Sequence, residues 1–323
     1  MPLIDHSTYR APWLFRSAHL QTIYPTVFRW KPQITKERER IETPDGDFLD
    51  LDWHFNPISR RLVILTHGLE GSSDRAYIQG MAHVFAKAGW NVLAWNFRGC
   101  SGEINKVIKT YHSGATEELQ IVLDHVFKQD KFTEIALVGF SLGGNVTLKY
   151  LGDRAQEVDT RIKSAVAISV PCDLKGSSLR LERSENRVYM ERFMISLRSK
   201  IRKKIQLFPD QVEDKGLKDM RTFRQFDDAY TAPMHGFEDA NDYWARCSSK
   251  PVLPNITVPA LLINSIDDPF LPTECYPSEI ARESKYFHLE VPSHGGHVGF
   301  VSFGKSGTYW SERRALEFVL WKK

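Results

Sequence analysis

The segment EIALVGFSLGGN, residues 134–145, decides the fold expected for this chain. Residues 134–140 form a nearly continuous apolar run, typical of a strand buried on both faces. The pattern GxSxG at residues 139–143 follows directly, and a helical pattern begins at Leu142. Between a strand and a helix, GxSxG predicts a tight turn that lifts the Ser141 hydroxyl above the sheet as a nucleophile. The alternative is a serine that only caps the helix.

Strand-like and helix-like patterns alternate on both sides of this segment. A turn signal at residues 43–46 separates two short strands and predicts a hairpin. The alternation predicts an α/β fold with a mostly parallel central sheet flanked by helices. We expect strands at residues 40–42, 48–55, 61–66, 91–95, 134–140, 164–170, 260–264 and 286–291, and helices at residues 77–87, 116–128, 142–151 and 310–321.

The alternation stops between about Asp173 and Lys250, where the sequence is charged and helix-like. We therefore predict a helical cap over residues 173–250, inserted into a core of residues 1–172 and 251–323 that carries an N-terminal extension, residues 1–39. Within the cap, residues 184–208 combine an apolar stripe with basic residues: Arg187, Arg192, Arg198, Lys200, Arg202, Lys203 and Lys204. We favour a cap helix packed on the sheet. Peripheral membrane contact through this basic face is the alternative.

A serine nucleophile needs a base, and the base needs an acid that holds its tautomer. After the expected strand 260–264 stand Asp267 and Asp268, and we prefer Asp268 because Pro269 disfavours helical geometry there. After the strand 286–291 stand His294 and His297. We prefer His297 as the base, since the two preceding glycines free the loop to aim its ring. A metal pair made by the two histidines is the alternative.

The motif HGLEG at residues 67–71 follows the expected strand 61–66. A loop at this place can present the backbone N–H of Leu69 beside that of Leu142. Two such donors would stabilise the oxyanion of a tetrahedral intermediate. A His67 ring that only braces the loop is compatible with this role.

Composition narrows the class of protein. The 323 residues are 42% hydrophobic, as in globular proteins, and the formal charge of +3 is too small and too dispersed to indicate nucleic-acid binding. The four cysteines lie far apart, without the spacing of a zinc site or a disulfide framework. The first residues lack a signal-peptide core, and no stretch approaches about 20 apolar residues. We expect a cytoplasmic protein.

Several motifs resemble the YheT-like branch of the α/β-hydrolase superfamily, which is related to eukaryotic hydrolases of the ABHD1 and ABHD3 kind. They are AHLQT from residue 18, TPDGDFLDLDW from 43, HGLEGS from 67, NFRGCSGE from 96, YHSG from 111, GFSLGGN from 139, DDPF from 267 and GGHVGF from 295. The resemblance implies a catalytic triad of Ser141, Asp268 and His297. It also implies esterase or acylglycerol lipase activity.

The sequence thus predicts a serine hydrolase that cleaves carboxylic esters through an acyl-enzyme, with no cofactor and no metal. Its expected partner is a small-molecule ester or lipid, and not a nucleic acid. An acyltransferase that passes the acyl group to an alcohol is one alternative. A non-catalytic binding module is another, although its usual signature is the loss of a triad residue, and none is lost here.

Overall fold

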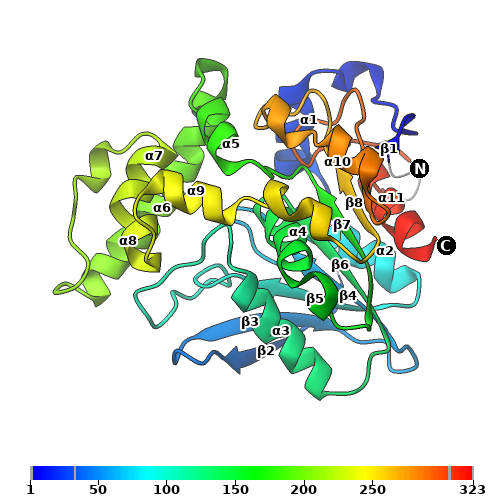
Figure 1. The fold of residues 1–323 in the computed structure, drawn as a ribbon, viewed down its shortest axis with the longest axis horizontal. Helices are drawn as coiled ribbons and strands as arrows, with labels where there is room; N and C mark the ends of the chain where they lie inside the picture. The colour runs from blue at the N-terminus through cyan, green and yellow to red at the C-terminus, as the bar shows by residue number, and fades with distance from the viewer. Residues whose placement is uncertain (1–2, 33, 305–306, 322–323) are drawn as a thin grey trace.

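The central sheet organises the structure, a computed structural model that describes residues 3–32, 34–304 and 307–321 (Figure 1). Within these residues the sheet has nine strands in the order β1-β9-β8-β7-β6-β4-β5-β3-β2. All neighbours pair in parallel except β2 with β3 and β3 with β5. The strands are β1 (Leu3–Ile4), β2 (Glu37–Glu42), β3 (Phe48–His54), β4 (Arg61–Thr66), β5 (Asn91–Asn96), β6 (Glu134–Phe140), β7 (Ile162–Ile168), β8 (Ala260–Ile263) and β9 (Phe287–Glu290).

Helices cover both faces of the sheet. One face packs on α3 (Thr116–Lys128), α4 (Leu142–Arg154) and α10 (Ser278–Glu283), and the other on α2 (Ala76–Lys87) and α11 (Trp310–Leu320). Helix α1 (Ala18–Phe28), near the N-terminus, contacts α2. The predicted α/β architecture with a mostly parallel sheet is confirmed. The sequence patterns did not indicate β1, α1 or α10, because β1 has two residues, α10 has six, and α1 contains Pro25.

Helices also fill the chain between β7 and β8. They are α5 (Leu174–Leu181), α6 (Arg187–Leu207), α7 (Phe223–Phe226), α8 (Ala232–His235) and α9 (Ala240–Cys247). In Figure 1, α6 to α9 lie to one side of the sheet. Helices α5 to α8 contribute to one apolar cluster, which includes Met190, Met194 and Ile201, and α9 contributes Tyr243 and Trp244 to another. The boundaries of a separate cap at residues 173 and 250 stay a prediction.

The basic face expected on α6 is only partly exposed. Arg198 is buried, and its guanidinium binds the backbone carbonyls of Met194 and Lys218. Lys204 is fully buried and donates to the carbonyls of Asn105 and Val107. Burial lowers the pKa of Lys204 to about 8. The exposed cations of this helix therefore include Arg202 and Lys203 but not these two residues. No helix in the described part of the chain is long and apolar enough to cross a membrane.

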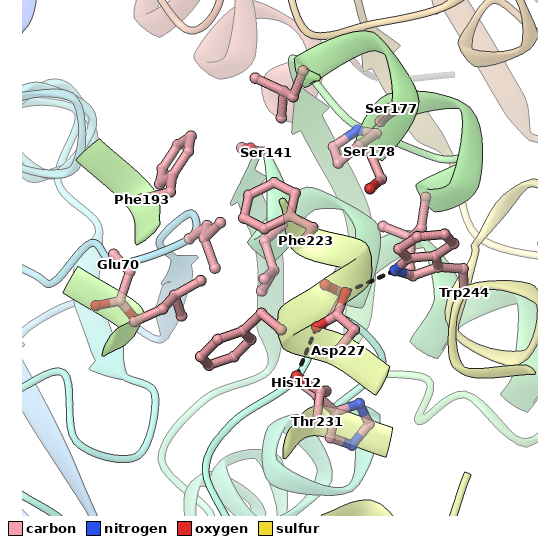
Figure 2. Close-up of a pocket in the computed structure, with 18 of the residues that line it drawn as sticks. Glu70, His112, Ser141, Ser177, Ser178, Phe193, Phe223, Asp227, Thr231 and Trp244 are labelled. Atoms are coloured by element: carbon pink, nitrogen blue, oxygen red, sulfur yellow. Dashed lines mark hydrogen bonds between the residues drawn. The ribbon is translucent and has the colours of Figure 1, made fainter. Parts of the chain in front are cut away.

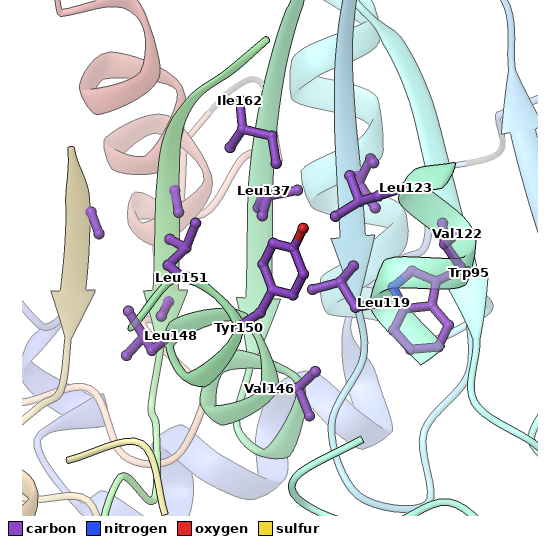
Figure 3. Close-up of a cluster of buried hydrophobic side chains, with 14 of the residues drawn as sticks. Trp95, Leu119, Val122, Leu123, Leu137, Val146, Leu148, Tyr150, Leu151 and Ile162 are labelled. Atoms are coloured by element: carbon purple, nitrogen blue, oxygen red, sulfur yellow. The ribbon is translucent and has the colours of Figure 1, made fainter. Parts of the chain in front are cut away.

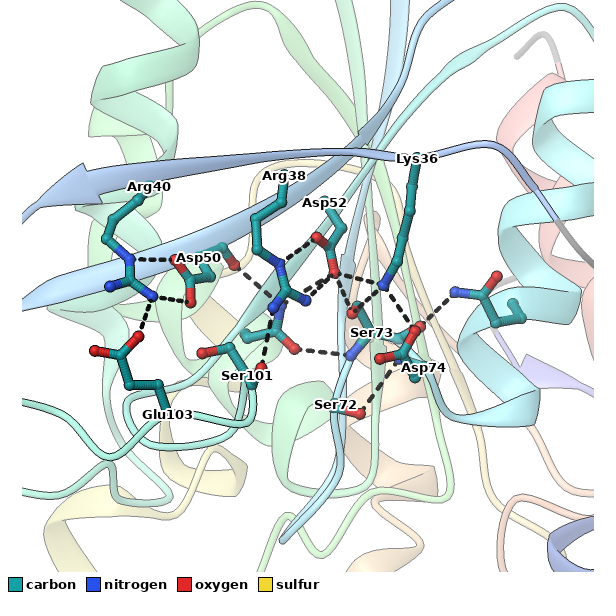
Figure 4. Close-up of polar contacts among 12 residues, drawn as sticks. Lys36, Arg38, Arg40, Asp50, Asp52, Ser72, Ser73, Asp74, Ser101 and Glu103 are labelled. Atoms are coloured by element: carbon teal, nitrogen blue, oxygen red, sulfur yellow. Dashed lines mark hydrogen bonds and ion pairs between the residues drawn. The ribbon is translucent and has the colours of Figure 1, made fainter.

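Ion pairs join the edge strand β2 to its neighbour β3 in the hairpin (Figure 4). Arg38 lies directly opposite Asp52, and Arg40 directly opposite Asp50. Each arginine binds its partner through two nitrogens, with distances of 2.7 to 2.9 Å. Burial by itself raises the pKa of Asp52, but hydrogen bonds from Arg38, Ser73 and Lys36 outweigh it and lower the pKa well below its ordinary value. The hairpin is thus stabilised where an edge strand has only one neighbour.

The main core lies between the sheet and the pair α3–α4 (Figure 3). Leu137 on the central strand β6 is surrounded by side chains of both helices, including Leu119, Leu123 and Tyr150. Only about 1% of Leu137 is exposed. Packing at this position holds β6, and therefore the turn that follows it, in place.

We predict that Leu137→Ala lowers the free energy of unfolding by about 2–5 kcal/mol, the usual cost of a cavity in a packed core. Chemical denaturation followed by circular dichroism would measure it. Ile58→Ala is the control, since Ile58 is 92% exposed and its truncation should cost under about 0.5 kcal/mol. Equal losses in the two variants would contradict the assignment of the core.

Candidate active site

Ser141 occupies the turn between β6 and α4. Its backbone has φ 51° and ψ −120°, a conformation that non-glycine residues seldom adopt. The Ser141 N–H donates to the Ile168 carbonyl at 2.9 Å, which ties the turn to β7. A Cβ on Gly143 would lie 2.4 Å from the carbonyl oxygens of Thr66 and His67. Only glycine at 143 therefore lets α4 start so close to the end of β4.

The loop after β9 presents His297. Gly296 before it has φ 55°, and a Cβ there would lie 2.5 Å from the Ala18 carbonyl of α1. The His297 N–H donates to Thr22 Oγ1 at 2.9 Å, and Gln21 Oε1 accepts from Val301 N–H. The N-terminal helix therefore supports the loop that carries the histidine. Sequence reasoning missed this role of Gln21 and Thr22, because nothing local links residues about 280 positions apart.

Three of the predicted side chains are in contact. His297 Nε2 lies 2.9 Å from Ser141 Oγ, and His297 Nδ1 lies 2.9 Å from Asp268 Oδ2 and 3.2 Å from Oδ1. The Asp268 side chain is fully buried, and its Oδ1 also accepts from the Phe270 N–H. The Phe270 ring lies 4.2 Å from the His297 ring, between centroids, and covers it. The carboxylate fixes one ring nitrogen and leaves the other for the serine.

The two competing candidates, Asp267 and His294, lie beside this arrangement. Asp267 Oδ1 accepts from the Gly296 N–H at 2.9 Å, and its Oδ2 lies 3.3 Å from His294 Nδ1. The His294 side chain is 38% exposed, against 10% for His297. This second pair holds the loop that carries His297. Among the hydrogen bonds of the described residues, neither of its side chains contacts Ser141.

The loop at residues 67–71 packs against the turn at Ser141. His67 is fully buried, and burial lowers its pKa to about 4, so the ring is neutral at pH 7. Its Nδ1–H donates to the Gly68 carbonyl, and its Nε2 accepts from the Phe97 N–H. The ring therefore braces the loop. Leu69 and Leu142, the predicted backbone donors, both line the cavity that reaches Ser141.

Glu70 joins this loop to helix α6. Its Oε1 lies 2.8 Å from Lys200 Nζ and accepts from the Tyr111 hydroxyl at 2.6 Å, and its Oε2 accepts from Ser196. Tyr111 in turn accepts from the Glu70 N–H. Burial alone raises the pKa of Glu70, but Lys200 lowers it below its ordinary value. Sequence reasoning missed this pair, which spans 130 residues.

A largely apolar cavity extends from Ser141 between the sheet and the helices α5, α6, α7 and α9 (Figure 2). The space inside it, open solvent at its mouth included, is about 970 Å³. Its apolar walls include Leu69, Leu142, Leu174, Leu181, Phe193, Leu197, Ile201, Phe223, Phe226 and Trp244. Phe193 and Leu197 of α6 line this cavity, whereas Met194 of the same helix is buried in the apolar cluster with Met190 and Ile201.

Asp227 is a buried acid in the wall of this cavity, away from Ser141 (Figure 2). Its carboxyl group accepts from Thr231 Oγ1 at 2.7 Å and from Trp244 Nε1 at 2.9 Å. Burial raises the pKa of Asp227 to about 7, although both hydrogen bonds oppose the rise. No sequence pattern singled out Asp227, which stands in the charged segment of residues 173–250.

A second cavity also reaches Ser141 and His297. Its walls come from α1, the loop at residues 68–77 and α6, and they include Ile23, Val27, Lys31, Arg75 and Arg192. Phe193 and Phe270 line both cavities. The serine therefore stands where an apolar cavity and a partly cationic one meet.

Comparison with known proteins gives a consistent result. The sequence matches the α/β hydrolase fold family over residues 61–302. It is 37% identical to YheT of Escherichia coli (strain K12), with 89% of this chain and 85% of that protein covered. It is 31% identical to the human phospholipase ABHD3, with 93% and 78% covered. A monoacylglycerol lipase of Saccharomyces cerevisiae is 29% identical, with 88% and 63% covered.

Solved structures show the same fold. The Pyrococcus furiosus esterase Pf2001 superposes with a TM-score of 0.60 at 19% identity, and 98% of each chain is covered. Mouse α/β hydrolase domain-containing protein 10 superposes with a TM-score of 0.54 at 11% identity, with 88% and 98% covered. With the match over residues 61–302 and the sequence identity to YheT, these results show that the chain belongs to the α/β-hydrolase family, in the branch that contains YheT and ABHD3.

Proposed function

We propose that this protein is a serine hydrolase that cleaves carboxylic esters, with Ser141 as nucleophile, His297 as base and Asp268 as the acid. The observation that carries the proposal is the continuous contact from Ser141 Oγ through His297 to Asp268, with both nitrogens of the ring engaged at 2.9 Å. The strained backbone at Ser141 supports it, since nucleophile elbows have this geometry. Relatives named phospholipase and monoacylglycerol lipase support an ester substrate.

The proposed reaction has two steps. His297 Nε2 accepts the Ser141 hydroxyl proton as the oxygen attacks the ester carbonyl, and it then protonates the departing alcohol. Asp268 accepts from the other ring nitrogen, which holds the tautomer and stabilises the imidazolium. The backbone N–H groups of Leu69 and Leu142 bind the oxyanion. Water, activated by the same histidine, then releases the acid from the acyl-enzyme.

The two cavities suggest how a substrate lies. The apolar cavity, which contains Leu197 and Phe223, suits an acyl chain. The second cavity, with Lys31, Arg75 and Arg192, suits the more polar alcohol portion. An ester carbonyl at Ser141 would then have its acyl side under α6 and its alcohol side toward α1.

We predict that a fluorophosphonate probe labels the wild type at Ser141 and that Ser141→Ala abolishes both the label and turnover of a soluble aryl ester. The loss in kcat should be on the order of 10⁶-fold, because the acyl-enzyme no longer forms. Peptide mass spectrometry would locate the label. Ser178→Ala is the matched control, since Ser178 lines the same cavity and should leave the label in place.

The products of the same ester assay, run with added alcohol, distinguish hydrolysis from acyl transfer. Free acid as the main product supports hydrolysis, and a new ester would instead indicate an acyltransferase. Full turnover by a folded Ser141→Ala protein would contradict the proposed nucleophile.

The paired candidates give a second prediction. His297→Ala should lose several orders of magnitude in kcat, and Asp268→Asn about 10⁴-fold, because the ring is no longer held in the working tautomer. His294→Ala and Asp267→Asn should lose far less, since this pair holds only the loop. Steady-state kinetics on folded variants would measure the four losses. A larger loss in the second pair than in the first would reverse the assignment.

The apolar cavity gives a third prediction. Leu197→Gln should lower kcat/KM for octanoyl esters about tenfold and leave acetyl esters nearly unchanged, because each buried methylene contributes about 0.8 kcal/mol. A chain-length series of aryl esters would measure the effect. Leu207→Gln is the control, since Leu207 lies on the same helix but is 53% exposed. An unchanged chain-length profile in Leu197→Gln would move the acyl chain out of this cavity.

A further inference from the structure

The N-terminal segment carries a concentration of exposed large apolar side chains. Trp13 is 77% exposed and Trp30 is 73% exposed, and Leu20, Ile23, Val27 and Phe28 between them are 43–69% exposed. Leu20, Ile23 and Val27 follow the i, i+3, i+7 spacing of one helix face, while Gln21 and Pro25 on the other face are buried. The outward side of α1 is therefore an apolar surface with a tryptophan beyond each end.

The same segment carries only positive charges. Residues 6–36 contain no Asp or Glu and five Lys or Arg residues. Arg29 and Lys36 pair with acids elsewhere in the fold. Arg10, Arg16 and Lys31 are exposed beside the apolar surface. Apolar and aromatic side chains on one helix face, flanked by cations, fit an interface with anionic lipid.

The cap helix α6 continues this surface across the second cavity. Tyr189 on α6 lies 2.9 Å from His19 on α1, between the hydroxyl and Nδ1, so the two helices meet. On the outer side of α6, Val188 is 75% exposed and Ile195 57%, with Arg192 exposed between them. The cavity between the helices, which Ile23 and Arg192 line, leads to Ser141.

We propose that residues 10–31, with Val188, Arg192 and Ile195 of α6, form a docking surface for an anionic phospholipid bilayer. We call it the docking surface. Charge complementarity favours this occupant over a second copy of the chain, because a symmetric contact would bring the two cationic segments together. Of the basic residues of α6 that the sequence offered for membrane contact, this surface includes Arg192 but not Arg202, Lys203 or the buried Lys204.

Docking here would place the cavity mouth at the lipid, so that a substrate could pass from the bilayer to Ser141 without crossing water. This last step rests on the proposed ester hydrolysis. The docking itself does not, because it depends only on the exposed side chains and their charge.

The test is co-sedimentation with vesicles of phosphatidylcholine and phosphatidylglycerol in equal parts, compared with phosphatidylcholine alone. The full chain should bind the anionic vesicles, and added salt should weaken the binding by screening the cations. The double variant Trp13→Glu/Trp30→Glu should reduce the partition coefficient at least about tenfold, and Arg10→Glu/Arg16→Glu should reduce binding to anionic vesicles only. Ile58→Glu is the matched control, since Ile58 is 92% exposed in another part of the fold.

Turnover of a soluble short-chain ester, measured on the same proteins, separates docking from catalysis. Lost vesicle binding with full turnover in Trp13→Glu/Trp30→Glu supports the proposal. Three results overturn it and leave the proposed hydrolase untouched. The first is no vesicle binding by the wild type. The second is an equal loss of vesicle binding in Ile58→Glu. The third is a wild-type dimer in light scattering that Trp13→Glu/Trp30→Glu abolishes, with no vesicle binding by either of these two proteins.

Discussion

The strained turn at Ser141 is the constraint on which the rest of the site depends. A non-glycine residue with φ 51° is held there only because β6, α4 and the neighbouring strands leave it no alternative. The Thr66 and His67 carbonyls pack against Gly143, and the Ile168 carbonyl accepts from Ser141. The central sheet and its packed core therefore do more than provide stability, because they determine the position of one hydroxyl group.

The other half of the site depends on contacts far apart in sequence. His297 stands on a loop with left-handed backbone at Gly296, Val298 and Phe300, and such a loop needs support from outside. Asp267 and Ser265 bind it from the β8 side, and Thr22 from α1. The second aspartate, which competed with Asp268 in the sequence, thus has a role of its own in placing the base.

The sequence predicted the features that depend on local patterns, and it missed the contacts that join residues far apart in the chain. The sequence patterns located strands β4 to β9 and helices α2, α3, α4 and α11 to within a few residues, because each shows an apolar run or a helical spacing in its own segment. Pro269 and Gly295–Gly296, two signals that act on the local backbone, favoured Asp268 and His297, and these are the members of each pair that lie in line with Ser141. Glu70–Lys200, Asp227–Trp244 and Thr22–His297 join distant elements, and no local pattern records such contacts.

The Glu70–Lys200 pair links the site to helix α6. Glu70 follows Leu69, a proposed oxyanion donor, and itself has a left-handed φ of 53°. Its carboxylate is held by Lys200 and Ser196 of α6, and α6 also supplies Phe193 and Leu197 to the apolar cavity. A shift of α6 would therefore alter the cavity and pull on the loop at the same time. If Leu69 binds the oxyanion and the acyl chain lies in this cavity, as proposed, α6 would contact the acyl chain and also help to hold the group that stabilises the transition state.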